Sequence, residues 1–335
     1  MRIAIIGAGM AGLACAERLV ALGHQVRLFD KGRGPGGRMS TRRVASAAGQ
    51  AEFDHGAQYF TVREEAFQRR VAAWIAAGHV AAWPEAGNEA HVGVPGMSAP
   101  LRQMAEALGV SFATQITGLA RDFGGFRLST ATAGLIDAEA AVVALPAEQA
   151  TALLAPLAPD LAAQASAHPS APCWTVLLAL TQPLATTAPC WRGADTDILA
   201  WAARNSSKPG RRGPESWVLQ AAADWSRRHL EADPDWVAKT LQDALSQSLG
   251  MPLPPPLVVQ SHRWRFAKSG LAKSHLAKSH LAMSGAAGPR SIWDPQRRLG
   301  VCGDWLIGPR VEAAWLSGTS LADQIGAAHQ GQTRA

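Results

Sequence analysis

The stretch RIAIIGAGMAGLACAERLVALGHQVRLFD, residues 2–30, decides the fold. It opens with a short apolar run, Arg2 to Ile6, which is typical of a strand buried on both faces. A Gly-x-Gly-x-x-Gly motif follows, and apolar residues then recur at helical spacing as far as a glycine stop. A second apolar run ends at Asp30, 18 residues beyond the last glycine of the motif. Strand, glycines, helix, strand and acid, in this order, predict a Rossmann-like unit that binds a dinucleotide.

Each residue of this motif has a physical role. Gly7 permits a tight turn, Gly9 lets the backbone approach a pyrophosphate, and Gly12 allows the helix to pack closely on the strand. The first helical residues, Met10 and Ala11, add the partial positive charge of a helix N-terminus. Asp30 can accept hydrogen bonds from the ribose hydroxyls of an adenosine. Its charge would repel a 2′-phosphate, which argues against NADP at this site.

The next stretch, FDKGRGPGGRMSTRR at residues 29–43, combines glycines with five cations. Ordered glycine costs conformational entropy, so such a cluster needs a reason. A simple NAD site requires no second loop of this kind. A site for extended FAD does, because the chain must wrap the pyrophosphate and reach the flavin ring.

In these residues the sequence resembles the FAD-containing amine oxidases and their renalase relatives, which carry an acid, a basic residue and then Gly-Gly-Arg. Here those positions are Asp30, Lys31, Gly36, Gly37 and Arg38. The resemblance implies that Arg38 neutralises the pyrophosphate and that the backbone from Gly37 to Met39 lies along the ribityl chain. Arg42 and Arg43 are either substrate contacts or solvated charges, and the second interpretation is favoured.

Two further stretches carry the resemblance. FDHGAQYFT, residues 53–61, resembles the segment that passes under the flavin ring in these oxidases. The resemblance implies that Gly56 and Ala57 permit close approach and that Gln58 and Tyr59 lie beside the ring. LGVCGDWLIGPRVEAAWLSG, residues 299–318, resembles the segment that places an acid on a ribityl hydroxyl and a helix N-terminus on the flavin pyrimidine. The residues implied there are Gly303, Asp304, Val311, Glu312 and Ala313.

The renalase branch, particularly its bacterial members, is matched by HRWRFA at residues 262–267 and by IWDPQRRLGVCGDW. This resemblance implies noncovalent FAD and oxidation of misreduced dihydronicotinamide dinucleotides, with the hydride on ring carbon 2 or 6. The products are NAD(P)+ and hydrogen peroxide, so the partners are the dinucleotide and dioxygen. Two alternatives stay open: a flavin-containing amine oxidase and a non-enzymatic flavin-binding protein. A single tyrosine argues against a tyrosine-lined amine cage.

Hydride transfer to a flavin needs no acid–base pair, so the catalytic residues are not assigned. The candidates for the pocket wall are aromatic faces for a nicotinamide and cations for its phosphates: His262, Arg263, Trp264, Arg265 and Trp305. An equally weighted alternative for HRWRFA is an alternating strand that packs Trp264 and Phe266 into a core.

The fold class expected is α/β (α+β): a Rossmann-like FAD-binding domain with an inserted mixed-sheet substrate domain. We expect residues 1–62, 95–155 and 286–330 to form the FAD-binding domain. Residues 63–94 and 156–285 are expected to form the substrate domain, and 331–335 a flexible tail. Within the substrate domain, a five-residue unit repeats almost verbatim from 267 to 285 and predicts a lengthened loop.

Composition bounds the remaining possibilities. The chain has 335 residues, 47% of them hydrophobic and 17% charged, which suits two ordinary globular domains. No signal peptide or membrane span is recognisable, so the cytoplasm is expected. The four cysteines lack metal spacing, and no metal site is expected. The net charge of +6 is spread along the chain, and nucleic-acid binding is not expected.

Overall fold

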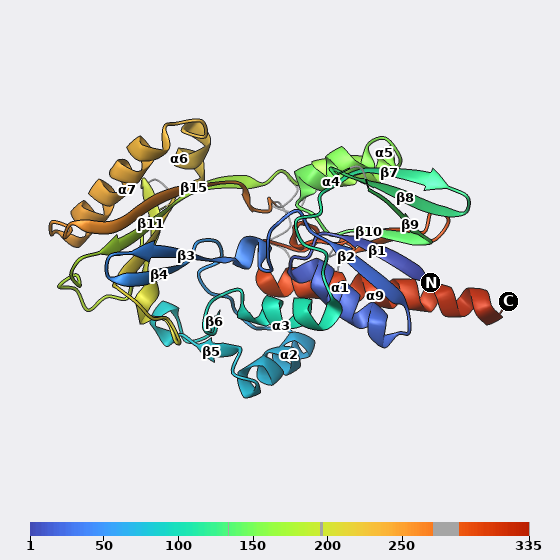
Figure 1. The fold of residues 1–335 in the computed structure, drawn as a ribbon, viewed down its shortest axis with the longest axis horizontal. Coiled ribbons are helices and arrows are strands. Elements are labelled where there is room, and N and C mark those ends of the chain that lie inside the picture. The colour runs from blue at the N-terminus through green and yellow to red at the C-terminus, as the bar shows by residue number, and fades with distance from the viewer. Residues whose placement is uncertain (133, 195–196, 271–287, 335) are drawn as a thin grey trace. The chain divides into compact units, whose positions relative to one another are not determined.

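The computed structural model describes residues 1–132, 134–194, 197–270 and 288–334. These residues form two compact units (Figure 1). Unit 1 comprises residues 1–37, 101–170 and 269–335, and unit 2 comprises 38–100 and 171–268. Most of the repeat, residues 271–285, lies outside the described residues. Among the described residues, no helix is both long and apolar enough to cross a bilayer.

Unit 1 is built on a five-stranded sheet with the order β16-β17-β10-β1-β2. Its parallel strands are β1 (Arg2–Ile6), β2 (Gln25–Phe29), β10 (Ala140–Val143) and β17 (Leu299–Val301). The edge strand β16 (Ile292–Asp294) runs antiparallel to β17. The sequence between Arg2 and Asp30 therefore forms the βαβ unit that its pattern predicts, and the α/β fold class is confirmed.

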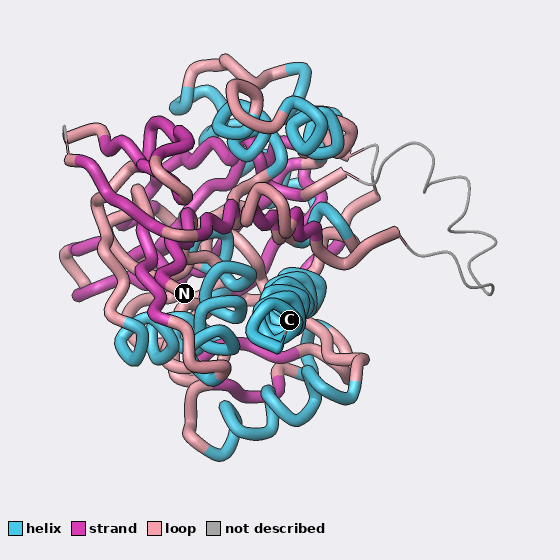
Figure 2. Tube along the Cα trace, turned by 90° about the vertical axis from the view of Figure 1, so that its right-hand side faces the viewer, coloured by secondary structure: helices cyan, strands magenta, loops and turns pink. Residues whose placement is uncertain are grey.

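Two helices of this unit, α1 (Met10–Ala21) and α9 (Val311–Arg334), run alongside each other in both views (Figures 1 and 2). They approach closely because Gly318 has no side chain: a Cβ there would lie 2.1 Å from the carbonyl oxygen of Ala11. Residues 331–334, expected to be a flexible tail, continue α9 instead.

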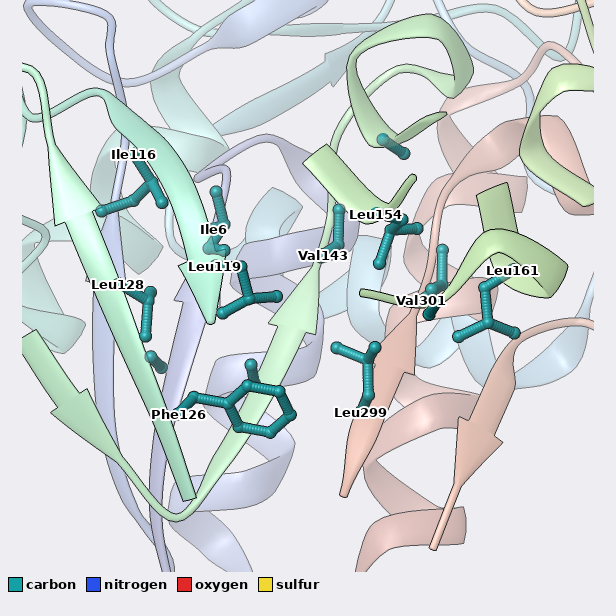
Figure 3. Close-up of a cluster of buried hydrophobic side chains, with 14 of the residues drawn as sticks. Ile6, Ile116, Leu119, Phe126, Leu128, Val143, Leu154, Leu161, Leu299 and Val301 are labelled. Atoms are coloured by element: carbon teal, nitrogen blue, oxygen red, sulfur yellow. The ribbon is translucent and has the colours of Figure 1, made fainter. Parts of the chain in front are cut away.

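A hydrophobic core of unit 1 joins the sheet to a smaller antiparallel sheet and two helices (Figure 3). The smaller sheet consists of β7 (Ile116–Asp122), β8 (Gly125–Thr130) and β9 (Leu135–Ala138). The helices are α4 (Ala147–Leu154) and α5 (Pro159–Ser166). Phe126 of β8 and Leu161 of α5 are both buried in this core with Val143 of β10. A further helix, α3 (Ala99–Leu108), spans the point where the chain passes from unit 2 to unit 1.

Unit 2 is built on a five-stranded sheet with the order β12-β13-β14-β11-β15, in which every pair is antiparallel, so this sheet is not the mixed sheet expected. Its strands are β11 (Ala171–Leu180), β12 (Cys190–Arg192), β13 (Leu199–Arg204), β14 (Ser216–Ala221) and β15 (Pro256–Lys268). One face packs on α6 (Ala223–Arg228) and α7 (Pro234–Leu249) through an apolar core. Alternate residues of β11 and β14 point to the other face. That second face is only partly covered by apolar groups, which leaves part of it to polar side chains.

The covered part of the second face lies under the hairpin of β3 (Thr41–Ser46) and β4 (Gly49–Asp54). Ala51 and Phe53 of β4 pack there against Leu177 and Val218. The remaining elements of unit 2 are α2 (Glu65–Ala76), β5 (Val80–Ala82) and β6 (His91–Gly93).

The two units alternate along the chain, and their boundaries differ from those predicted. Residues 38–62 and 95–100 belong to unit 2, because β3 and β4 pack on its sheet. Residues 156–170 belong to unit 1, because α5 packs into the core of that unit. The strand expected at HRWRFA is present within β15.

Candidate functional site

The glycine motif of unit 1 has the geometry of a dinucleotide cradle. Gly7 has a φ of 103°, and a Cβ there would lie 2.5 Å from the carbonyl oxygen of Ala144. A Cβ on Gly12 would lie 1.9 Å from the carbonyl oxygen of Gly7, so only glycine lets α1 start this close to β1. A Cβ on Gly9 would meet no protein atom within 4 Å. The backbone at Gly9 therefore faces open space at the N-terminus of α1, as the approach of a pyrophosphate requires.

The acid at the end of β2 is tied to this loop. Asp30 Oδ2 accepts a hydrogen bond of 2.7 Å from the Ala8 amide, and Oδ1 accepts one of 2.7 Å from Gly32. Each carboxylate oxygen has a second lone pair, so ribose hydroxyls can still bind. Gly37 lies beside the glycine motif in space, because a Cβ on it would be 3.7 Å from the Cα of Gly9. Lys31 instead donates to the side chain of Gln149 at 3.2 Å.

The C-terminal motif of unit 1 lies at the end of β17. The Gly303 amide donates to Ser317 Oγ at 2.9 Å, which ties the loop to α9. Asp304 is buried, and its Oδ2 accepts a hydrogen bond of 2.8 Å from Ser269. The helix α9 begins at Val311, and Glu312 and Ala313 in its first turn are buried. These positions are compatible with the ribityl and pyrimidine contacts that the resemblance implies, and those contacts stay predictions.

Trp305 does not have the environment of a pocket wall. It is 1% exposed, its Nε1 donates to the Leu145 carbonyl at 3.2 Å, and it belongs to the core of unit 1. Core packing accounts for this side chain, so the expectation that it faces a substrate finds no support.

In unit 2, residues 54–59 form a segment held tightly to the end of η1 (Gly37–Met39). The Ala57 amide donates to the Arg38 carbonyl at 2.8 Å. A Cβ on Gly56 would lie 2.0 Å from that same oxygen, so this position needs glycine. Met39, which directly follows Arg38 in the chain, is buried. The close approach that the structure shows at Gly56 is to the Arg38 carbonyl, and its approach to a flavin ring stays a prediction.

A buried ionic cluster anchors the start of this segment. Asp54 Oδ2 accepts hydrogen bonds from Lys208 at 3.3 Å and from Arg211, and all three side chains are at most 1% exposed. Lys208 also donates to Gln58 Oε1 at 3.2 Å, and the Gln58 amide nitrogen donates back to the Asp54 and Gly56 carbonyls. Burial and the neighbouring Arg211 lower the pKa of Lys208 to about 8, although Asp54 opposes the shift.

The carboxylate of this cluster stays charged. Burial alone would raise the pKa of Asp54, but the cations Lys208 and Arg211 and the Met97 amide hold it well below its usual range. Lys208 and Arg211 were not identified from the sequence. They lie in a stretch without a motif, and only the fold brings them to Asp54, more than 150 residues away.

The polar part of the second sheet face carries a row of paired residues that crosses all five strands. Strand register pairs Arg192 with Trp201, Trp201 with Gln220, Gln220 with Thr175, and Thr175 with His262. Paired side chains of antiparallel strands lie on the same face of the sheet. We call these five residues the cross-strand row.

Segment 54–59 lies along the cross-strand row and contacts it repeatedly. The ring of His55 meets that of His262 edge-on at 5.0 Å. Gln220 Nε2 donates to the Gly56 carbonyl at 2.7 Å. The ring of Tyr59 lies 5.7 Å from that of Trp201, and its hydroxyl accepts a hydrogen bond of 3.0 Å from Arg192. The predicted Gly56 and Tyr59 are thus brought to the cross-strand row, whereas the residue that contacts His262, His55, was not identified from the sequence.

The two predicted aromatic residues of β15 lie in one cluster with His55. The rings of Trp264 and His55 stack at 5.1 Å, and the rings of Trp264 and His262 meet at 4.5 Å. Trp264 Nε1 donates to the His55 carbonyl at 2.8 Å. His262 also borders an open cavity of about 640 Å³ beside β15, lined by Trp174, Glu231, Ala232, Asp233, Pro234, Ser261, His262 and Arg263.

Both imidazoles are neutral at pH 7. Burial, with the charges of His262 and Arg42, lowers the pKa of His55 to about 3, while Asp54 and Ser40 oppose the shift. Burial and Arg42 lower the pKa of His262 to about 4. A neutral imidazole has one N–H donor and one nitrogen acceptor, which suits hydrogen bonding to an uncharged polar group.

The cations predicted to face substrate phosphates point the other way. Arg263 and Arg265 both pair with Glu231, and Arg265 lies 2.7 Å from it. Arg263 also donates to the Leu230 carbonyl at 2.7 Å and covers the ring of Trp174 at 5.5 Å. In a strand, neighbouring side chains alternate between faces, so Arg263 is on the opposite face to His262 and Trp264. The two ion pairs with Glu231 explain the orientation of both arginines.

The two neutral histidines predict a loss of stability in acid. Unfolded imidazoles take up protons near pH 6.5, whereas His55 and His262 do so only near pH 3 and 4 when folded. Between pH 6.5 and 4 the unfolded chain therefore binds more protons, and the free energy of unfolding falls as the pH is lowered. We expect urea unfolding at pH 7, 6 and 5 to show this slope, and the double variant His55→Asn/His262→Asn to reduce it. An unchanged slope in the double variant would contradict the assignment.

The fold and the glycine cradle define a class of protein with a Rossmann-like dinucleotide-binding unit. A family model described as NAD(P)-binding Rossmann-like domain matches residues 5–74, and one described as flavin containing amine oxidoreductase matches residues 75–326. The chain belongs to the flavin-containing amine oxidoreductase family and is an FAD-dependent enzyme. The glycine cradle and Asp30 fit this cofactor.

Solved structures share the fold across nearly the whole chain. A putative protoporphyrinogen oxidase from Exiguobacterium sp. 255-15 superposes with a TM-score of 0.70 at 12% identity, covering 97% of this chain and 98% of that one. Cyclohexylamine oxidase from Brevibacterium oxydans IH-35A superposes with a TM-score of 0.68 at 13% identity, covering 98% and 99%. At this level of identity the similarity establishes the fold alone.

Curated relatives match over a short stretch. A 4,4'-diapophytoene desaturase from Staphylococcus haemolyticus is 60% identical over 40 residues, which is 12% of this chain and 8% of the desaturase. The corresponding enzyme of Staphylococcus aureus (strain Newman) is 52% identical over 40 residues, with the same coverage. This chain therefore matches less than a tenth of the length of these relatives.

Proposed function

We propose that the protein is an FAD-dependent oxidase of misreduced dihydronicotinamide dinucleotides, as its resemblance to renalases implies. The substrate carries its hydride on ring carbon 2 or 6. Substrate, dioxygen and a proton would give NAD(P)+ and hydrogen peroxide. All four cysteines are free, which fits a reducing compartment, and we place the reaction in the cytoplasm.

The observation that carries this proposal is that the cross-strand row combines uncharged polar groups with nearby positive charges. The row presents the amide of Gln220 and the neutral imidazole of His262, with cations at Arg192, at the other end of the row, and at Arg42. Thr175 and Trp201 of the row are buried. An uncharged ring with a carboxamide suits these groups. The phosphates of a dinucleotide would be attracted by the cations.

An amine finds a less suitable environment there. An anion stabilises an ammonium group, and the carboxylates of these elements already have partners: Asp54 pairs with Lys208 and Arg211, and Glu231 with Arg263 and Arg265. Asp233 accepts hydrogen bonds from the first amides of α7.

The chain's own groups would bind and orient the substrate. His262 and Gln220 offer hydrogen bonds to a carboxamide, and Trp264 offers an aromatic face. When bound, FAD accepts the hydride and transfers electrons to dioxygen. Proximity and orientation then control the rate, because a misplacement of about 1 Å can cost a hundredfold.

A flavin-containing amine oxidase is the second candidate. The pair of Tyr59 and Trp201 favours it, because two aromatic rings could flank an amine. However, Arg192 lies over the Trp201 ring at 4.7 Å and bonds to Tyr59. A cation in this position would repel an ammonium group. The family and the structural neighbours support an enzyme over a non-enzymatic flavin protein.

Anaerobic reduction of the holoenzyme tests the proposal. We expect rapid bleaching of the flavin absorbance by the 2- and 6-dihydro isomers of NAD(P) and slow or no bleaching by the 4-dihydro form. Benzylamine and putrescine should leave the flavin oxidised. Rapid bleaching by an amine, with no response to the dihydro isomers, would favour the amine-oxidase alternative.

A further inference from the structure

Two neighbouring arginines on β3 have opposite surroundings. Arg43 pairs with Glu52 of β4 at 2.9 Å, and both side chains lie on one side of the hairpin. Arg42 is paired in register with Phe53, and Phe53 packs against the five-stranded sheet of unit 2. Val44, two residues further along β3, packs against the same core. Arg42 therefore points towards the sheet, and Arg43 points away from it.

On the sheet side, Arg42 is next to the end of the cross-strand row. Strand β3 contacts β15, and the charge of Arg42 acts on both His55 and His262. The two imidazoles cannot neutralise this charge. Among the described residues, Arg42 has no ion pair with a carboxylate, whereas Arg43, Arg263 and Arg265 each have one. The site thus combines neutral ring-binding groups with Arg42, a cation that pairs with no carboxylate in the described part of the chain. Arg192, at the far end of the row, likewise pairs with no carboxylate there but donates to the Tyr59 hydroxyl.

We propose that Arg42 binds the phosphate attached to the nicotinamide ribose, so that the site selects nicotinamide nucleotides over nicotinamide ribosides. This inference rests on the proposed function and specifies its substrate class. A guanidinium can form two parallel hydrogen bonds to a phosphate, which gives geometric specificity as well as affinity. The ring-binding groups beside it would place the nicotinamide, and Arg42 would fix the first charged group that follows.

Calorimetric binding to the oxidised holoenzyme tests this directly. The probes are nicotinamide mononucleotide and nicotinamide riboside, which differ only in the phosphate. We expect the wild-type protein to bind the mononucleotide about tenfold or more tightly than the riboside, as expected of a charge-assisted hydrogen bond. Arg42→Gln should abolish this preference, and Arg42→Lys should retain part of it. The matched control Arg43→Gln should bind like the wild type.

Turnover provides an independent measurement. With the misreduced mononucleotide, Arg42→Gln should raise the KM about tenfold or more and leave the limiting bleaching rate nearly unchanged, because the lost contact is equal in ground and transition states. With the misreduced riboside, Arg42→Gln should behave like the wild type.

Three results would overturn the inference: equal affinities of the wild type for the two probes, a preference that persists in Arg42→Gln, or loss of FAD from that variant. The last result would assign Arg42 to the cofactor. Failure of the proposed function has a different signature. In that case no dihydronicotinamide would bleach the flavin. The relative affinities for nicotinamide mononucleotide and nicotinamide riboside in calorimetry would still show whether Arg42 binds a phosphate.

Discussion

Replacing Asp54 by Asn is expected to lower the free energy of unfolding by about 3–5 kcal/mol, because it leaves two buried cations without an anion. Lys208 and Arg211 are at most 1% exposed in their side chains, and neither can reach water without opening unit 2. Such a loss is a large fraction of the total stability of a typical domain, about 5–15 kcal/mol. Urea unfolding followed by circular dichroism measures the change.

The adjacent acid on β4 supplies the control. Glu52 pairs with Arg43 at a partly exposed position, so Glu52→Gln should change the stability by at most about 1 kcal/mol. Adding Lys208→Met to Asp54→Asn should recover part of the loss, because an apolar side chain needs no counter-ion. If Asp54→Asn were as stable as Glu52→Gln, the cluster would not have the electrostatic role assigned to it.

The second large effect concerns two glycines of the cradle, Gly12 and Gly9, which differ in whether an added Cβ would meet protein atoms. Gly12→Ala would place a Cβ 1.9 Å from the backbone of Gly7, so α1 must move, and both the stability and FAD binding should fall. Gly9→Ala meets no protein atom within 4 Å. We therefore expect Gly9→Ala to retain the thermal stability of the apoprotein while its affinity for FAD falls about tenfold or more, because the methyl group occupies the approach path of the pyrophosphate.

Quenching of flavin fluorescence on titration of the apoproteins measures these affinities. Thermal unfolding of the same samples separates a folding defect from a binding defect. Full FAD affinity in Gly9→Ala would show that the pyrophosphate does not approach this glycine.

Local sequence predicts the nucleotide-binding half of the fold well. Residues 2–30 follow one another in sequence and need only the strand, turn and helix rules to fold as they do. The glycine at position 56 lies in a motif that predicts approach to a flavin ring, whereas the close approach seen in the structure is to the Arg38 carbonyl. The strand that contains His262 and Trp264 follows from its alternation, and alternation also explains why Arg263 and Arg265 have a different environment.

The cross-strand row could not be predicted in the same way. Its five members come from five strands, and only the register between strands places Gln220 and Thr175 beside His262. A shift of one residue in any strand would send its member to the opposite face. Lys208 and Arg42 depend on the same long-range pairing. Trp305, expected to line the pocket, is buried in the core of unit 1, because an indole next to a cofactor motif is equally suited to a core.

The interleaving of the two units has a consequence for synthesis. The chain crosses between the units four times, and β17 and α9 come from the last crossing. Strand β10 lacks its neighbour β17, and α1 lacks its partner α9, until residues beyond 268 have left the ribosome. The first glycine motif is synthesised early, but unit 1 cannot complete its fold until the whole of unit 2 and the residues after it have been synthesised. A nascent chain would therefore gain its FAD cradle last, and a chain that stopped early would expose the apolar side of α1 to chaperones and proteases.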